Sequence, residues 1–314
     1  MIFQIRYGAV CLCLGMLFLV QFVRGQTADQ AQNRADLLRT RANPTYGPPS
    51  GEETGYAVES PNDKDLGEQE LLQRREKYLP FSFSVTTPVF YTSNVALVHR
   101  GEQDDVLFAP AISAAYQPRL TQNLFLEIGL TQQFFVYGRF SELNFASMDA
   151  IAGLSYYIPQ FHNLSLRAIY DYNRLTDTDD FDEFFVNHAY ILSANMPFRI
   201  GRAQQLVIGI DTELSFYAHP EAPRRNDYSV YVGYSVALSR HFSIDATGRI
   251  AVRDYHAVDR TDVTEILALS ANYHINQWFT LSFLSSFAWN QSNLSVFEYD
   301  VADVGGGVAL TVRF

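Results

Sequence analysis

The chain has 314 residues, of which 47% are apolar, 14% aromatic and 18% charged, and its formal net charge is −11. The charged fraction is below the roughly 25% that is usual in soluble domains, and the apolar fraction is too high for a disordered protein. The acidic balance and the lack of a Lys/Arg cluster exclude a basic nucleic-acid-binding protein, so we expect no nucleic-acid partner.

Residues 1–25 have the features of an export signal. Arg6 precedes an apolar run of about 17 residues, and the sequence before Gln26 predicts cleavage there. The alternative is a retained membrane anchor, for which a run of this length is marginal. Both cysteines, Cys11 and Cys13, lie in this segment, so the mature chain has no thiol for a disulfide or a thiolate metal site.

Residues 26–79 differ from the rest of the chain. They are rich in Gln, Asp and Glu, carry Pro and Gly between Asn43 and Gly51, and show little alternation. This composition is typical of a flexible exported tail, which we expect in the periplasm. Its last part, 66–78, is compatible with a short amphipathic helix.

From Pro80 to Phe314 apolar and polar residues alternate. Leu206, Ile208 and Ile210 share one parity, for example, and a helical period cannot produce such a set. The pattern predicts twelve strands, an even number as in bacterial single-chain barrels. They lie near 81–92, 106–117, 122–137, 146–158, 163–175, 184–197, 204–217, 227–240, 242–256, 262–274, 277–290 and 298–314.

The connections between these strands alternate between short and longer polar segments. This alternation favours an up-and-down meander with tight turns at the periplasmic end and longer loops outside. An even strand number places both ends of the strand domain, 80–314, on the periplasmic side. The fold class we predict is therefore all-β, a transmembrane antiparallel up-and-down barrel of about twelve strands with a flexible N-terminal tail.

The residues on the two faces of the strands indicate whether the inner or the outer face of the barrel meets water. A ring of twelve strands is wider than the roughly eight whose interior side chains can fill, so an apolar interior would pack poorly. Lys, a usual protector of soluble edge strands, is absent from 80–314. A secreted soluble barrel or sandwich remains the alternative. The charged residues that we expect in the lumen, some at a constriction, are Glu127, Asp149, Arg167, Asp171, Asp211, Glu213, Asp245, Arg249, Arg253 and Arg313.

Aromatic residues recur where strands meet turns, as in the two girdles of membrane barrels. Core aromatics of a soluble sandwich are the alternative explanation. The predicted periplasmic girdle consists of Tyr116, Tyr156, Phe242, Tyr273 and Phe279, and the outer girdle of Phe134, Tyr170, Phe216, Tyr228, Phe287 and Trp289.

Two short motifs carry a family resemblance. The last strand alternates from Val304 and stops on a terminal aromatic, Phe314. This resembles the assembly-signal strand of bacterial outer-membrane β-barrel proteins, which implies recognition by the barrel-assembly machinery. The segment from Phe90 to Val95 resembles the end of the first strand in the β-barrel porin families. The resemblance implies an outer-membrane location, with outer-membrane lipid and lipopolysaccharide as surroundings.

No catalytic arrangement stands out in the sequence, and we expect no enzyme, no metal and no cofactor. The seven histidines show no spacing of a ligand pair. Outer-membrane phospholipases carry a lipid-facing His and Ser two residues apart, but Tyr190 follows His188 at that spacing and Ser193 has the opposite parity. The acidic run from Asp177 to Glu183 lacks the pattern of a calcium loop, so a solvated loop is favoured over a cation site.

Three functional hypotheses follow. The first is a porin-like passive channel or transport barrel for small solutes, whose nearly balanced lumen charges predict no strong ion selectivity. The lumen charges can instead pair across a plugged bore, with the tail folded inside. The second is a structural or adhesive surface barrel with a closed lumen. The third is an autotransporter-like translocator, for which residues 26 to about 65 would be a small passenger.

Overall fold

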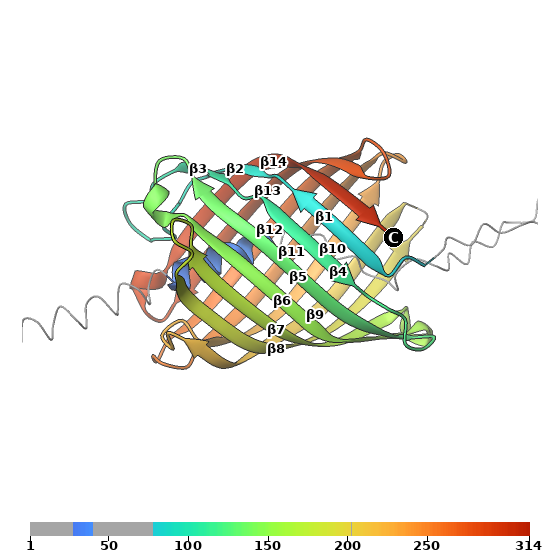
Figure 1. Ribbon diagram of the computed structural model, residues 1–314, viewed down its shortest axis with the longest axis horizontal. Coiled ribbons are helices and arrows are strands. Elements are labelled where there is room, and N and C mark those ends of the chain that lie inside the picture. The colour runs from blue at the N-terminus through green and yellow to red at the C-terminus, as the bar shows by residue number, and fades with distance from the viewer. Residues whose placement is uncertain (1–27, 40–77, 202) are drawn as a thin grey trace, which may run out of the picture.

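The computed structural model describes residues 28–39, 78–201 and 203–314. The strands form one closed antiparallel sheet (Figure 1). They are β1 (Phe81–Thr86), β2 (Val89–Thr92), β3 (Asp105–Phe108), β4 (Ala111–Tyr116), β5 (Leu124–Tyr137), β6 (Phe145–Ile158), β7 (Leu164–Asp177), β8 (Glu183–Ile200), β9 (Gln204–His219), β10 (Arg225–Ala237), β11 (Phe242–Tyr255), β12 (Thr261–His274), β13 (Phe279–Ser292) and β14 (Tyr299–Arg313).

The fourteen segments make a barrel of twelve strands. Proline has no N–H to give to a ladder, and Pro88 and Pro110 interrupt the first two strands. β1 and β2 pair with β14 in one continuous register, and β3 and β4 do the same with β5. The pairing of β14 with both β1 and β2 closes the ring. The predicted strand number is confirmed, with boundaries within about three residues.

The apolar side chains point away from the barrel axis. Ile208 and Val232 are 44% and 46% exposed, whereas their inward neighbours Val207 and Tyr231 are buried. Short turns and both ends of the barrel, Phe81 and Arg313, lie at one end, which we assign to the periplasm. The longer connections, such as 93–104 and 138–144, lie at the outer end.

Residues 28–39 form a helix inside the ring of strands, drawn in blue in Figure 1. This corrects the expectation of a flexible tail over the whole of 26–79. The rest of that tail, with all of the expected helix 66–78 except Tyr78, lies outside the described residues, as does the export signal 1–25. Among the residues that the structure describes, no helix is long and apolar enough to cross a membrane.

Candidate functional site: a helix in the lumen

Helix 28–39 lies in the outer half of the lumen. Near its start, the Asp29 carboxylate accepts hydrogen bonds from Arg260 Nη1 at 3.0 Å and from the Tyr255 hydroxyl at 2.9 Å, beside the loop that joins β11 to β12. At its end, Arg39 bonds to Asp149, several residues down β6 from the outer rim. The helix therefore points its N-terminus outward. An acid in the first turn and an arginine in the last also suit the helix dipole.

One face of the helix is apolar and contacts an apolar part of the barrel wall. Ala28, Ala31, Ala35 and Leu38 follow helical spacing, and all four are buried. Their wall partners come from the outer ends of neighbouring strands, and two of these, Phe135 and Phe145, stack with ring centroids 4.1 Å apart. The buried wall cluster includes Phe90, Leu107, Phe135, Phe145, Leu175 and Phe185.

A second face of the helix meets three buried arginines. Arg225 Nη1 and Arg253 Nη1 donate to Asn33 Oδ1 at 2.6 and 2.8 Å, and Arg225 also bonds to Asp36. Arg260 supplies the third guanidinium, through Asp29. These arginines are almost wholly shielded from solvent, and the helix carboxylates balance their charge together with Asp227 and Asp262 of the wall.

Arg260 shows how strongly the outer loop is ordered. Its guanidinium lies over the Phe297 ring at 3.6 Å and over the Tyr255 ring at 4.0 Å. Burial alone lowers the pKa of Arg260, but hydrogen bonding to Asp262 and the charge of Asp29 outweigh it and raise the pKa above its ordinary value. Arg260 therefore stays charged and holds the N-terminal end of the helix.

The third face carries Arg34 to the opposite wall. Arg34 Nη1 lies 3.2 Å from Asp303 Oδ1 on β14 and donates to Thr92 Oγ1 at 3.2 Å. Its Nη2 donates to the carbonyl of Asn94 at 2.6 Å. Both charged side chains are only 2% exposed. Helix acids thus pair with wall arginines, and a helix arginine pairs with the wall carboxylate of Asp303.

The predicted lumen residues all lie on the inward parity of their strands, and the structure gives most of them specific partners. Glu127 Oε2 accepts from Arg167 Nη2 at 2.6 Å, and Asp245 accepts from Asn272 at 2.8 Å. Glu213 accepts from Asn187 at 3.3 Å. Of the remaining positions, Asp149 and Arg253 contact the helix, and Asp171 lines the cavity below it. Asp211 and Arg249 lie on the inner face of β9 and β11, and Arg313 is exposed at the periplasmic rim.

A cavity of about 560 Å³ lies below the helix, and Leu38 and Arg39 at the helix end form its roof. Much of its wall is made of small hydroxyl-bearing or glycine positions. These include Ser84, Thr86, Ser113, Thr131, Ser282 and Gly307. Ile151, Ile191 and Leu284 add an apolar strip, and Asp149 and Asp171 add charge. Among the residues that the structure describes, those of the outer half fill the lumen, whereas those of the inner half surround this cavity.

Sequence reasoning missed the helix and its aromatic wall. The signal was present at the outer strand ends, where large apolar residues occupy both parities instead of one. Phe134 and Phe135 are adjacent, as are Phe184 and Phe185. An apolar residue on the inner face of a wide barrel needs something apolar to cover it, and helix 28–39 does so.

The predicted girdle residues lie on the outward parity. Tyr156, Phe216, Tyr228, Tyr273, Phe279, Phe287 and Trp289 are exposed, and Tyr116, Phe134, Tyr170 and Phe242 are partly covered by neighbours. The terminal Phe314 is 61% exposed and stacks on Phe81 with ring centroids 5.7 Å apart.

On the outward face, His188 is the residue to compare with the phospholipase arrangement. His188 Nδ1 lies 2.6 Å from the Tyr170 hydroxyl, among other outward aromatics. Ser193 points inward and is buried, so it does not join His188. Within the described part of the chain no group of three His, Cys, Asp or Glu side chains has the geometry to hold a metal ion.

Comparison with known structures supports the architecture. The COG4313 outer-membrane channel from Pseudomonas putida F1 matches with a TM-score of 0.54 and 12% identity, covering 76% of this chain and 97% of that one. The chain is an outer-membrane β-barrel. The barrel lies in the outer membrane. At 12% identity, the likeness to the channel shows a shared fold alone.

Looser likenesses are found as well. A KdgM porin in complex with disordered oligogalacturonate gives a TM-score of 0.40 at 7% identity, covering 72% of this chain and 98% of that one. Phospholipase A from the Escherichia coli outer membrane gives 0.44 at 15% identity, covering 74% and 93%. No protein-family model matches the chain, and no curated protein matches it.

Proposed function

We propose that the protein is a passive outer-membrane channel for small solutes, and that helix 28–39 is a removable plug of that channel. One observation carries the proposal. A helix fills the outer half of the lumen while a cavity of about 560 Å³ remains directly beneath it. A barrel that serves only as a scaffold has no need of such a space behind its plug.

The chemistry of the helix contacts supports a removable plug. Buried ion pairs add little net stability compared with apolar packing, because both charges lose their water. The helix nevertheless meets the wall through Arg34, Asp29 and Asp36 as well as through its alanines. When the helix leaves, these groups and their wall partners return to water at little cost. A charged interface is therefore suited to repeated docking and release.

The lumen charges favour a channel with broad rather than narrow solute selectivity. The wall offers both acids and arginines, and the helix brings Asp29 and Asp36 against Arg34 and Arg39. Removing the helix therefore leaves the balance of lumen charge unchanged. We expect the open channel to pass neutral and weakly charged small solutes with little ion preference.

The test is liposome swelling with purified full-length protein and with a variant that lacks residues 26–39. The variant should admit small sugars at least about ten times faster than the full-length protein, with a size limit shared by neutral solutes. Heat-modifiable mobility on gels checks that the barrel of the variant is folded. A folded variant that admits no solute would refute the channel and favour a closed structural or adhesive barrel.

The direction of the helix favours a second candidate, an autotransporter-like translocator. The helix has its N-terminus among the outer loops, and Tyr78 lies beside Gln117 at the periplasmic end. These two described segments are thus in the order that a segment translocated through the lumen would take. The predicted cleavage before Gln26 leaves only two residues ahead of the helix. Mass spectrometry of the mature N-terminus separates the two candidates, because a start at Gln26 without later cleavage contradicts the translocator.

A further inference from the structure

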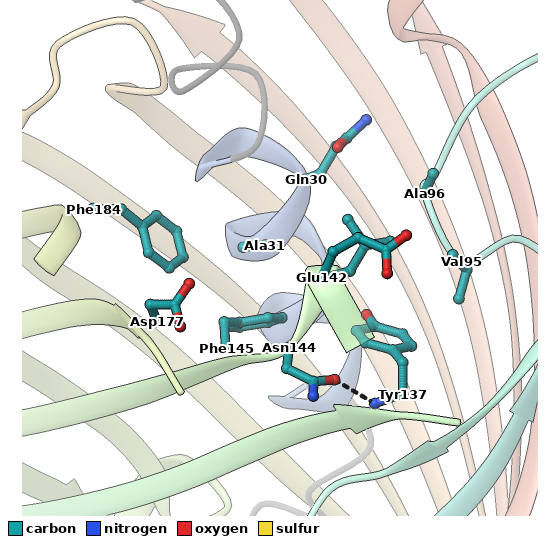
Figure 2. Close-up of a pocket in the computed structure, with 11 residues that line it drawn as sticks. Gln30, Ala31, Val95, Ala96, Tyr137, Glu142, Asn144, Phe145, Asp177 and Phe184 are labelled. Carbon is teal, nitrogen blue, oxygen red and sulfur yellow. Dashed lines mark hydrogen bonds between the residues drawn. The ribbon is translucent and has the colours of Figure 1, made fainter. Parts of the chain in front are cut away.

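A second pocket lies at the outer mouth, between helix 28–39 and the outer ends of β5 to β8. Its volume is about 190 Å³, and Figure 2 shows its lining side chains. Gln30 and Ala31 of the helix form one wall, and Val95 and Ala96 of the first outer loop form another. The pocket is thus partly built by the plug helix, and it is separate from the cavity beneath it.

Aromatic rings make the floor of this pocket. Tyr137 and Phe145 are 5% and 3% exposed, so both are fixed in place. Phe184 meets Phe145 edge to face with ring centroids 6.5 Å apart, and Phe145 stacks on Phe135. Asn144 Oδ1 accepts from the Tyr137 backbone N–H at 2.7 Å, as the dashed line in Figure 2 marks, and holds the loop against the strand. The floor is therefore aromatic and held by close packing.

Two carboxylates stand in the same pocket. Glu142 belongs to the 3-10 turn Ser141–Leu143, and Asp177 ends β7. Asp177 Oδ1 accepts from the Asp179 backbone N–H at 2.7 Å, which keeps the Asp177 side chain in position. Neither carboxylate forms an ion pair with a described residue, and no described lining residue is basic. The neighbouring Arg139 is bound to Asp104 at 3.0 Å.

We propose that this pocket binds a small organic cation with a ring-sized apolar body, such as an arylalkyl ammonium ion, from outside the cell. A cavity of about 150 Å³ accommodates benzene, so the space suits one ring and a short charged arm. Ring faces attract a cation by about 0.5–2 kcal/mol. Unpaired carboxylates add charge complementarity, and the apolar walls from Ala31, Val95 and Leu143 cover the ring.

The pocket has a consequence that rests on the proposed function. A ligand held there contacts both the barrel wall and the helix, so it binds only while the helix is docked. Linkage then requires that the ligand favour the closed channel, by about 100-fold at 100 times its Kd. Such an amine would therefore lower the fraction of time for which the channel is open.

Isothermal titration of the full-length protein in detergent tests the pocket. Phenethylammonium should bind at least about ten times more tightly than 2-phenylethanol, which has the ring without the charge, and phenylacetate should not bind. The double variant Glu142→Gln, Asp177→Asn should lose at least about tenfold in affinity. Asp180→Asn is the matched control, because it removes one charge from the same acidic loop outside the pocket lining.

Several results would overturn the proposal. They are equal affinity for the alcohol and the amine, an equal loss in the Asp180→Asn variant, or no binding of the amine at all. Binding of Ca²⁺ without binding of the amine would show an inorganic cation site instead. Gel mobility before and after boiling checks that each variant barrel is folded.

Titration and conductance separate this proposal from the channel. The variant that lacks residues 26–39 loses Gln30 and Ala31, and it should bind the amine at least about 100 times more weakly. If the amine binds the full-length protein but leaves its conductance unchanged, the pocket stands and the proposed plugging is wrong. If conductance follows the helix but no amine binds, the channel stands and the pocket proposal is wrong.

Discussion

The outer and inner halves of the lumen are built from the same twelve strands, yet they differ in what the strands present. The outer half carries large aromatic side chains and buried arginines, and helix 28–39 covers both. The inner half presents small side chains around a cavity of about 560 Å³. The side chains on the inner face of the barrel wall therefore differ between its two ends, and the described helix packs only against the outer one.

Of the substitutions considered, Arg34→Gln should weaken the binding of helix 28–39 to the outer half of the lumen most. Loss of one partner from a buried ion pair costs about 3–5 kcal/mol, because the other charge stays buried. The outer half should then release its helix. A cysteine at position 35 reports this, since Ala35 is 2% exposed and both native cysteines lie in the signal segment. The rate of thiol labelling should rise at least about 100-fold.

Arg39→Gln is the control for that variant. The Arg39 side chain is 37% exposed, so its loss should change labelling only slightly. Equal labelling in the two variants would show that the buried pair of Arg34 with Asp303 does not anchor the helix.

Phe135→Ala should weaken the outer half through packing instead of charge. Phe135 is fully buried against Phe145 in the wall cluster that packs against the helix. Truncation of such a ring costs about 3 kcal/mol. Labelling at position 35 should rise, and part of the cost should appear as a lower temperature of barrel unfolding. Phe134→Ala changes the adjacent, outward ring on the same strand and should leave the labelling rate unchanged. If Phe134→Ala raised the labelling rate more than Phe135→Ala, the helix would not pack against the inward ring of Phe135.

Asp149→Asn should have the smallest effect. Its partner Arg39 is partly exposed at the boundary between the two halves, and such pairs contribute about 0–1 kcal/mol. Labelling at position 35 should therefore rise no more than about fivefold. A rise near that of Arg34→Gln would show that the helix is held from the inner half.

The barrel could be predicted from the sequence because the alternation that defines each strand depends only on residues close together in the chain. Each strand repeats with a period of two, so residues such as Ile208 and Asp211 indicate their own faces. The ten predicted lumen residues lie on the inward parity for this reason. Their partners could not be predicted, because pairs such as Arg167 with Glu127 depend on which strands lie side by side.

Helix 28–39 could not be predicted in the same way. A helix of this length is marginal alone in water, and this one gains its stability from contacts with residues 58 to 269 positions away. Its composition, with Asp, Gln and Asn between alanines, resembles the exported tail that follows it. The useful clue was in the barrel: inward aromatics such as Phe135 and Phe185 need a cover.

Single-channel recording in planar bilayers tests the central claim most directly. Full-length protein and the variant that lacks residues 26–39 are inserted under the same salt, with gel mobility confirming both barrels. The full-length protein should be closed most of the time, and the variant should stay open with a unitary conductance set by the inner cavity. Equal conductance in the two proteins, or a silent but folded variant, would contradict a channel plugged by its own N-terminal helix.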